Sequence, residues 1–208
     1  MTKVRVYIDG FNLYHAIATL QKPALKWLNH HVLAQSLLRT GETLDEVNFF
    51  TAVLTWNAEK QRRHMNYIEA LTAYGVVVHQ TNFKKAQKYC KDEERYCRFY
   101  EEKQTDVAIA VKMVSDALAG ACDRAILVTA DSDQIPTARF LKGLPGFKLT
   151  LIFPPGRGGE ARDLGNVVSD RKELTPGLLG TCLLPRTVKD GAGRTVATMP
   201  AIYSNPPA

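Results

Sequence analysis

Short apolar segments alternate with segments of helical periodicity along most of the chain, and this alternation limits the possible fold more than any other feature. Strands are expected at residues 3–9, 46–54, 76–79, 123–130 and 148–153, and helices after Gly10 and at 31–39, 58–74, 105–119 and 133–142. Strands separated by helices form parallel sheets that are covered on both faces. We therefore predict an α/β fold with a doubly wound, mostly parallel sheet of five to six strands flanked by helices.

The C-terminal part of the chain departs from this alternation. Residues 156–159 form a Gly-rich loop, and the chain after about residue 175 is rich in Pro, Gly and Thr. A length of 208 residues suits one domain with a small appendage. We predict one domain over residues 1–155 and an irregular extension over residues 156–208, which packs on the domain or is partly disordered.

Composition restricts the compartment and the partners. No segment approaches about 20 consecutive apolar residues, so we predict no membrane span. The first residues lack the apolar stretch of a signal peptide, which predicts a cytoplasmic protein. A net charge of +6 and a pI of about 9.1 mildly favour an anionic partner such as nucleic acid.

Acidic residues follow two of the predicted strands and begin one helix. Asp9 ends the first strand, Asp131 and Asp133 follow the fourth strand, and Asp106 lies in the first turn of the helix that leads back to the fourth strand. If the strand order is 3-2-1-4-5, the first and fourth strands are neighbours at the switch point, beyond which ligands bind. We therefore predict that the four carboxylates converge at one edge of the sheet.

Converging carboxylates repel one another, and a divalent cation would relieve this repulsion. Oxygen ligands without a nearby His or Cys suit Mg²⁺ or Mn²⁺, which support phosphodiester cleavage. Each acid also has a plainer explanation: Asp106 can interact with the helix dipole, Asp133 can be an N-cap, and Asp9 and Asp131 can be turn residues. The convergence of four acids favours the metal site over four separate coincidences.

Three segments resemble the signature blocks of the NYN domain in its LabA-like (DUF88) branch, which is similar to PIN nucleases: YIDGFNLYHA (7–16), EEKQTDVAIAVKMV (101–114) and LVTADSDQIP (127–136). The resemblance covers about residues 3–155, and the tail at 183–203 resembles the extension that often follows. It implies a PIN/FLAP-like fold and a metal-dependent ribonuclease activity. By this resemblance, Asp9, Asp106, Asp131 and Asp133 fall on the acidic metal-site positions, and Asn12 and Ser132 fall on the polar positions beside them.

The segment 83–103 holds seven Lys or Arg residues, five aromatic residues and five acids. It is interpreted either as a flap that guides RNA by phosphate contacts and base stacking or as a solvated hairpin or helix. Cys90 and Cys97 lie in it, but zinc would need four ligands, so a metal there is the less favoured interpretation. Lys103 and Arg157 are further candidate substrate contacts, and Tyr14 and His15 are candidates for a substrate contact or for a core or rim role.

The leading hypothesis is a Mg²⁺- or Mn²⁺-dependent ribonuclease, more specifically an endoribonuclease, in which the four aspartates bind metal and act on single-stranded RNA. A homodimer is compatible with it. One alternative is a non-catalytic RNA-binding module. A metal-dependent phosphatase ranks lower, because the residues after Asp9 lack the Asp-x-Asp-x-Thr pattern of one large phosphatase superfamily.

Overall fold

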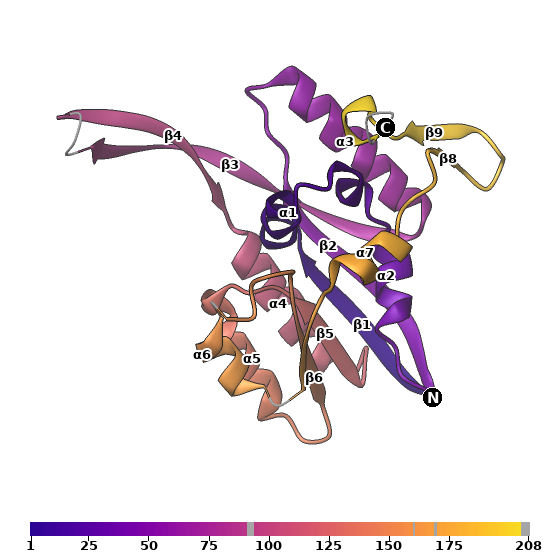
Figure 1. Cartoon of the computed structure of the whole chain (residues 1–208). Coiled ribbons are helices and arrows are strands. Elements are labelled where there is room, and N and C mark those ends of the chain that lie inside the picture. The colour runs from indigo at the N-terminus through magenta and orange to yellow at the C-terminus, as the bar shows by residue number, and fades with distance from the viewer. Residues whose placement is uncertain (91–93, 160, 169, 205–208) are drawn as a thin grey trace.

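The computed structural model describes residues 1–90, 94–159, 161–168 and 170–204, and it centres on a seven-stranded sheet in the order β4-β3-β2-β1-β5-β6-β7 (Figure 1). Its strands are β1 (Thr2–Asp9), β2 (Glu42–Ala52), β3 (Val76–Cys90), β4 (Arg95–Lys103), β5 (Arg124–Val128), β6 (Lys148–Phe153) and β7 (Arg171–Glu173). Adjacent strands pair in parallel except β3 and β4. The predicted α/β class and the order of the five predicted strands are confirmed.

The predicted number of five to six strands is wrong, because β4 and β7 extend the sheet to seven. β4 lies in the segment of mixed charges and aromatic residues, where no alternation of burial marks a strand. It pairs with the long β3 in an antiparallel hairpin that projects away from the body of the molecule (Figure 1). β7 has three residues, all of them exposed, so it carries no apolar signal.

The helices are α1 (Gly10–Thr19), α2 (His30–Ser36), α3 (Ala58–Ala73), α4 (Thr105–Leu118), α5 (Ile135–Lys142), α6 (Arg162–Val167) and α7 (Pro176–Thr181). Short 3-10 turns occur at η1 (Pro23–Trp27), η2 (Ser132–Gln134) and η3 (Ala201–Tyr203). The predicted helices are therefore present, although the one expected at 133–142 begins with η2. Among the described residues, no helix combines the length and apolarity that crossing a membrane requires.

Side chains of β1 alternate between two cores, one on each face of the sheet. Val4, Val6 and Ile8 pack into a core with α1, α2 and α3, whereas Tyr7 packs into a second core with α4, α5 and α6. This alternation follows from the period of two along a strand. Because both faces are covered, polar ligands have access to the ends of the central strands rather than to the faces of the sheet.

The C-terminal extension contributes to the first of these cores. Leu179 of α7, Val188 of β8 (Thr187–Lys189) and Ala197 of β9 (Thr195–Thr198) are buried there. Tyr203 of η3 packs partly buried against the same core. The described part of the extension therefore packs on the domain, and the boundary drawn at residue 155 stays a prediction.

Candidate active site

Three carboxylates meet at the carboxyl ends of the central strands. Asp9 ends β1, Asp131 follows the neighbouring β5, and Asp106 lies in the first turn of α4. Each of the three offers an oxygen atom, and these atoms all lie within 4.8 Å of one another. Asp9 is buried, with 4% of its surface exposed, whereas Asp106 and Asp131 are half-buried. The order of the strands thus brings together acids that are far apart in the sequence.

Hydrogen bonds fix the Asp9 carboxylate on both sides. The backbone N–H of Asn12 donates to Asp9 Oδ1 over 3.0 Å, and Thr129 Oγ1 donates to Asp9 Oδ2 over 2.8 Å. Asn12 Oδ1 in turn accepts from the backbone N–H of Ala130 over 2.9 Å. Asp9 therefore caps α1 and also ties the end of β1 to the end of β5.

Gly10 allows the sharp entry into α1 directly after Asp9. A Cβ atom at this position would lie 2.5 Å from the backbone oxygen of Phe50 and 2.6 Å from the Phe49 ring. Such contacts are too close for any side chain, so the strand end approaches β2 only with glycine here. The position of Asp9 depends on this close approach.

Asp131 and Asp106 are fixed through η2. Asp131 Oδ1 accepts from the backbone N–H of Asp133 over 2.9 Å and so caps the turn. The buried Gln134 donates through Nε2 to the backbone oxygen of Asp106 over 3.0 Å. The start of α4 is thereby held against the segment that carries Asp131.

Burial and mutual repulsion raise the pKa of two of these acids. Burial raises the pKa of Asp9 to about 6, against the hydrogen bonds from Asn12 and Thr129, and the charges of Asp106 and Asp131 add to the shift. The pKa of Asp106 is also raised, first by burial and then by the charge of Asp131. A cation would relieve this repulsion, and the three oxygen donors suit Mg²⁺ or Mn²⁺. The residues present therefore fit a hard divalent cation.

The other predicted site residues differ in whether they line the cavity beside these three aspartates. Arg157 lines a cavity of about 230 Å³ together with the three aspartates and Asn12. Ser132 and Asp133 are exposed and lie outside the described lining of that cavity, although the charge of Asp133 contributes to the raised pKa of Asp106. Lys103 is also exposed and pairs with Glu101 over 2.9 Å. The structure thus brings together three of the four predicted acids.

Glu102 is a carboxylate of this cavity that sequence reasoning missed. Its Oε1 accepts from the backbone N–H of Thr105 over 3.0 Å and from Thr81 Oγ1 over 3.1 Å. Gln104, with φ of 81°, makes the left-handed turn that joins β4 to α4 and places Glu102 beside Asp106. The available signal was an acid three residues before the helix start, a spacing at which a side chain reaches the first turn.

Thr129 is the second missed residue, since it links Asp9 to Asp131. Its hydroxyl donates to Asp9 and accepts from the backbone N–H of Asp131 over 3.0 Å. The signal in the sequence was a threonine directly after an apolar strand, and the structure shows that this threonine is fully buried. It holds two of the three acids at a fixed separation.

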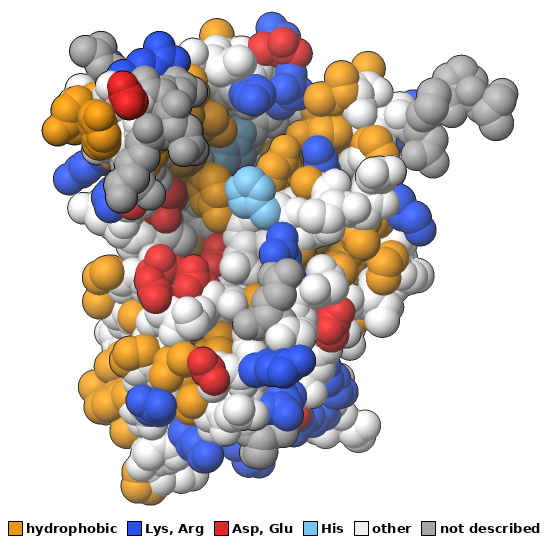
Figure 2. Space-filling model, turned by 60° about the vertical axis from the view of Figure 1, so that its left-hand side comes forward, with side chains coloured by type: hydrophobic (Ala, Val, Ile, Leu, Met, Phe, Trp, Pro, Cys, Tyr) orange, Lys and Arg blue, Asp and Glu red, His pale blue; other side chains and the backbone are white. Residues whose placement is uncertain are grey.

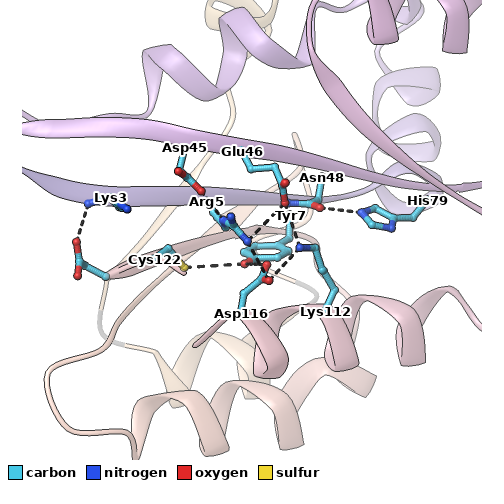
Figure 3. A network of polar contacts seen from close by, with 11 residues as sticks. Lys3, Arg5, Tyr7, Asp45, Glu46, Asn48, His79, Lys112, Asp116 and Cys122 are labelled. Atoms are coloured by element: carbon cyan, nitrogen blue, oxygen red, sulfur yellow. Dashed lines mark hydrogen bonds and ion pairs between the residues drawn. The ribbon is translucent and has the colours of Figure 1, made fainter. Parts of the chain in front are cut away.

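A partly buried polar network holds α4 on the sheet (Figure 3). Asp116 accepts from Tyr7 Oη over 2.7 Å and pairs with Arg5 and Lys112, each over 2.9 Å. Lys112 also pairs with Glu46 of β2 over 3.1 Å. Although burial opposes it, hydrogen bonds from Lys112, Tyr7 and Arg5 lower the pKa of Asp116. The network fixes the far end of the helix that carries Asp106.

A larger cavity of about 380 Å³ adjoins the acidic one, and both are lined by Phe11 and His15. On the face shown in Figure 2, acidic side chains gather near histidine side chains and a hollow bordered by hydrophobic side chains. The expectation that His15 contacts substrate or lines a rim agrees with its place between the cavities, but its role stays a prediction.

This doubly wound sheet, with three aspartates beyond its central strands, is consistent with the PIN-like nuclease superfamily. The sequence model of the NYN domain matches residues 3–170. The chain therefore belongs to the NYN domain family, whose nucleases act on RNA. This confirms the family resemblance, and the match extends beyond residue 155. The LabA-like branch stays a prediction.

Two other proteins are similar to this chain, one in sequence and one in structure. The 6-hydroxy-3-succinoylpyridine 3-monooxygenase of Pseudomonas putida is 25% identical in an alignment that covers 89% of this chain and 71% of that protein. A solved structure of a protein of unknown function from Vibrio parahaemolyticus RIMD 2210633 matches with a TM-score of 0.58 at 14% identity, covering 88% of this chain and 96% of that one. The second similarity shows a shared fold alone.

Proposed function

We propose that the protein is a ribonuclease, more specifically an endoribonuclease, that hydrolyses RNA with Mg²⁺ or Mn²⁺ bound by Asp9, Asp106 and Asp131. The observation that carries the proposal is the group of three carboxylates, whose oxygen atoms lie within 4.8 Å of one another. Burial and then mutual repulsion raise the pKa of Asp9 and Asp106, and a divalent cation would relieve the repulsion. Asp133 acts from outside this group, through its negative charge.

The roles of the protein's own groups follow from their exposure. Asp9 is buried and hydrogen-bonded on both oxygens, so it anchors the site rather than moving a proton. Asp106 and Asp131 are half-buried, and one of them would orient the attacking water and accept its proton. When bound, the cation would lower the pKa of water and stabilise charge on the leaving oxygen. Arg157 lines the same cavity and would contact the scissile phosphate.

Single-stranded RNA is the substrate that the surrounding surface favours. Exposed aromatic side chains lie near the base of the hairpin, where Trp56 stacks on Tyr100 with ring centres 3.6 Å apart. Aromatic faces stack on unpaired bases, and basic side chains contact the phosphates between them. Lys103 and Ser132 are exposed and lie near the cavity in sequence, so we propose them as outer contacts to the RNA backbone.

A cleavage assay on RNA labelled at its 5′ end tests the proposal. Wild type, Asp131→Asn and Glu69→Gln are compared with Mg²⁺, with Mn²⁺ and with EDTA. Glu69 is an exposed acid on α3, so its variant removes the same charge outside the described site. We expect internal cuts by wild type and Glu69→Gln with a cation, and none by Asp131→Asn. RNA binding without cleavage in any cation would instead indicate a binding module, and hydrolysis of p-nitrophenyl phosphate alone would indicate a phosphatase.

A second candidate function is oxidation of a small aromatic compound, as the name of the Pseudomonas putida relative states for that protein. The 380 Å³ cavity, with its aromatic lining, is the observation that favours it. Consumption of O₂ with 6-hydroxy-3-succinoylpyridine and a two-electron reductant such as NADH tests it. Uptake that depends on the pyridine would support this activity, and the absence of such uptake beside RNA cleavage would reject it.

A further inference from the structure

The 380 Å³ cavity is built from segments distant in the sequence, and its volume falls within the range of small-ligand sites. α1, β2, α3, the base of β3 and the C-terminal extension all contribute to it. Its lining includes Phe11, Tyr14, Phe49, Trp56, Tyr67 and Phe83. Its interior therefore suits a flat ring, which aromatic faces and edges contact well.

An aromatic wall connects this cavity to the acidic one. The Trp56 ring meets the Phe83 ring edge-on at 4.9 Å, and Phe83 meets Phe11 edge-on at 5.4 Å. Phe11 follows Asp9 by two residues and lines both cavities. The two cavities therefore adjoin at Phe11.

His30, a residue of the lining, carries a buried hydrogen-bond acceptor that is closed off from solvent. Tyr67 Oη donates its proton to the backbone oxygen of Leu28 over 2.6 Å, so His30 Nε2, at 3.2 Å, donates to the tyrosine oxygen. Burial lowers the pKa of His30 to about 3, so the ring is neutral and its Nδ1 carries a lone pair. Within the described part of the chain, this Nδ1 has no hydrogen-bond partner.

We propose that this cavity binds one unstacked nucleobase of the RNA strand that is cut in the acidic cavity. The base packs against the aromatic wall, and the His30 ring turns on binding so that its buried Nδ1 accepts an N–H of the base. A base is favoured over an apolar ring because an unpaired buried acceptor costs free energy that an N–H donor recovers. Lys26 and Lys60 also line the cavity and suit the phosphates beside the base. This inference rests on the proposed ribonuclease function.

The variant His30→Phe tests the inference, with His31→Phe as its matched control. Phenylalanine keeps a ring in place and removes the acceptor, and Tyr67 keeps its bond to Leu28. His31 is the neighbouring residue of α2 and lies outside the described lining of the cavity. His30→Phe also loses the bond from His30 Nε2 to the Tyr67 oxygen, so we expect it to fold with a thermal stability lowered by about the contribution of one hydrogen bond. We also expect it to cleave RNA at least about tenfold more slowly than wild type and the control, as the loss of one buried hydrogen bond implies.

The choice of RNA substrates distinguishes a failure of this inference from a failure of the proposed ribonuclease function. Oligoribonucleotides of one base type are compared with one that carries a single abasic nucleotide beside the cut bond. Slower cleavage at the abasic position, and by His30→Phe, would support the base site. Equal cleavage of all substrates by all three proteins would overturn it and leave the ribonuclease function intact.

If wild type cleaves no RNA, titration calorimetry with AMP, GMP, CMP and UMP in the presence of EDTA decides whether the cavity binds a nucleobase. Binding of at least one nucleotide by wild type, weakened by His30→Phe and unchanged by His31→Phe, would support a base site without cleavage. The absence of binding, binding unaffected by His30→Phe, or binding of nicotinate without any nucleotide would overturn the inference.

Discussion

Replacement of Asp9 by Asn is expected to stabilise the cation-free protein while abolishing cation binding. Burial raises the pKa of this carboxyl from 3.8 to about 6, so its charge destabilises the folded state at neutral pH. A shift of roughly two units at about 1.4 kcal/mol per unit gives a cost of about 3 kcal/mol above pH 6. Asparagine loses the bond from Thr129, which stabilises by about 1 kcal/mol. The net gain is therefore about 1–2 kcal/mol.

The pH dependence of this gain has a defined sign. A carboxyl whose pKa is higher in the folded than in the unfolded protein destabilises the fold increasingly as pH rises between these two values. The cost of Asp9 is therefore complete above about pH 6 and absent below 3.8. Thermal unfolding in EDTA should show Asp9→Asn melting about 2–8 °C above wild type at pH 8, since a chain of this size shifts by about 2–4 °C per kcal/mol. Near pH 4 the cost of the charge is almost absent, so Asp9→Asn should melt about 2–4 °C below wild type there, because it lacks the bond from Thr129.

Asp163→Asn is the matched control, since Asp163 is an exposed acid of α6. It should melt with wild type at both pH values. Addition of Mn²⁺ should raise the melting temperature of wild type and of the control, and leave Asp9→Asn unchanged. A melting temperature of Asp9→Asn below wild type by the same amount at pH 8 and pH 4 would refute the reasoning. Asp9 would then act as a helix cap whose charge carries no cost.

Three further predictions concern the surroundings of the site. Asp116→Asn should lower the free energy of unfolding in urea by about 1–3 kcal/mol and slow RNA cleavage, because it displaces Asp106. Asp45 lies at an exposed end of the same network, so Asp45→Asn should change neither the free energy of unfolding nor the cleavage rate. Gly10→Ala should unfold at lower urea concentration than wild type and lose cation binding, because its Cβ would lie 2.5 Å from the Phe50 oxygen; unchanged unfolding would contradict the close approach. Mn²⁺ at 100 times its dissociation constant should stabilise wild type by about 2.7 kcal/mol, and equal stabilisation by K⁺ at that concentration would argue against a divalent site.

Much of the fold was predictable because its signals are local. The apolar runs of β1, β5 and β6 and the helical spacing of α3 and α4 follow from which faces these segments bury. β4 and β7 were not predictable in this way, since most of their side chains face solvent and no burial pattern marks them. A strand that is held by backbone hydrogen bonds at a sheet edge leaves little trace in side-chain polarity.

The sequence by itself determined that acids would gather at the switch point. Asp9 and Asp131 follow neighbouring parallel strands, and the helix that begins near Asp106 returns antiparallel beside them. The alternation of elements sets the helix direction, and the strand order 3-2-1-4-5 was assumed and is confirmed, so the expected convergence of these acids needed no knowledge of side-chain contacts.

Only the tertiary structure decided which groups share the site and what adjoins it. Asp133 turns outward because η2 begins at the Asp131 cap, and Glu102 turns inward because Gln104 adopts a left-handed conformation. The aromatic cavity likewise combines α1, β2, α3, the hairpin and the C-terminal extension. The direction of a side chain depends on single backbone torsions, and a cavity depends on the packing of distant segments, so neither is contained in a local pattern of residues.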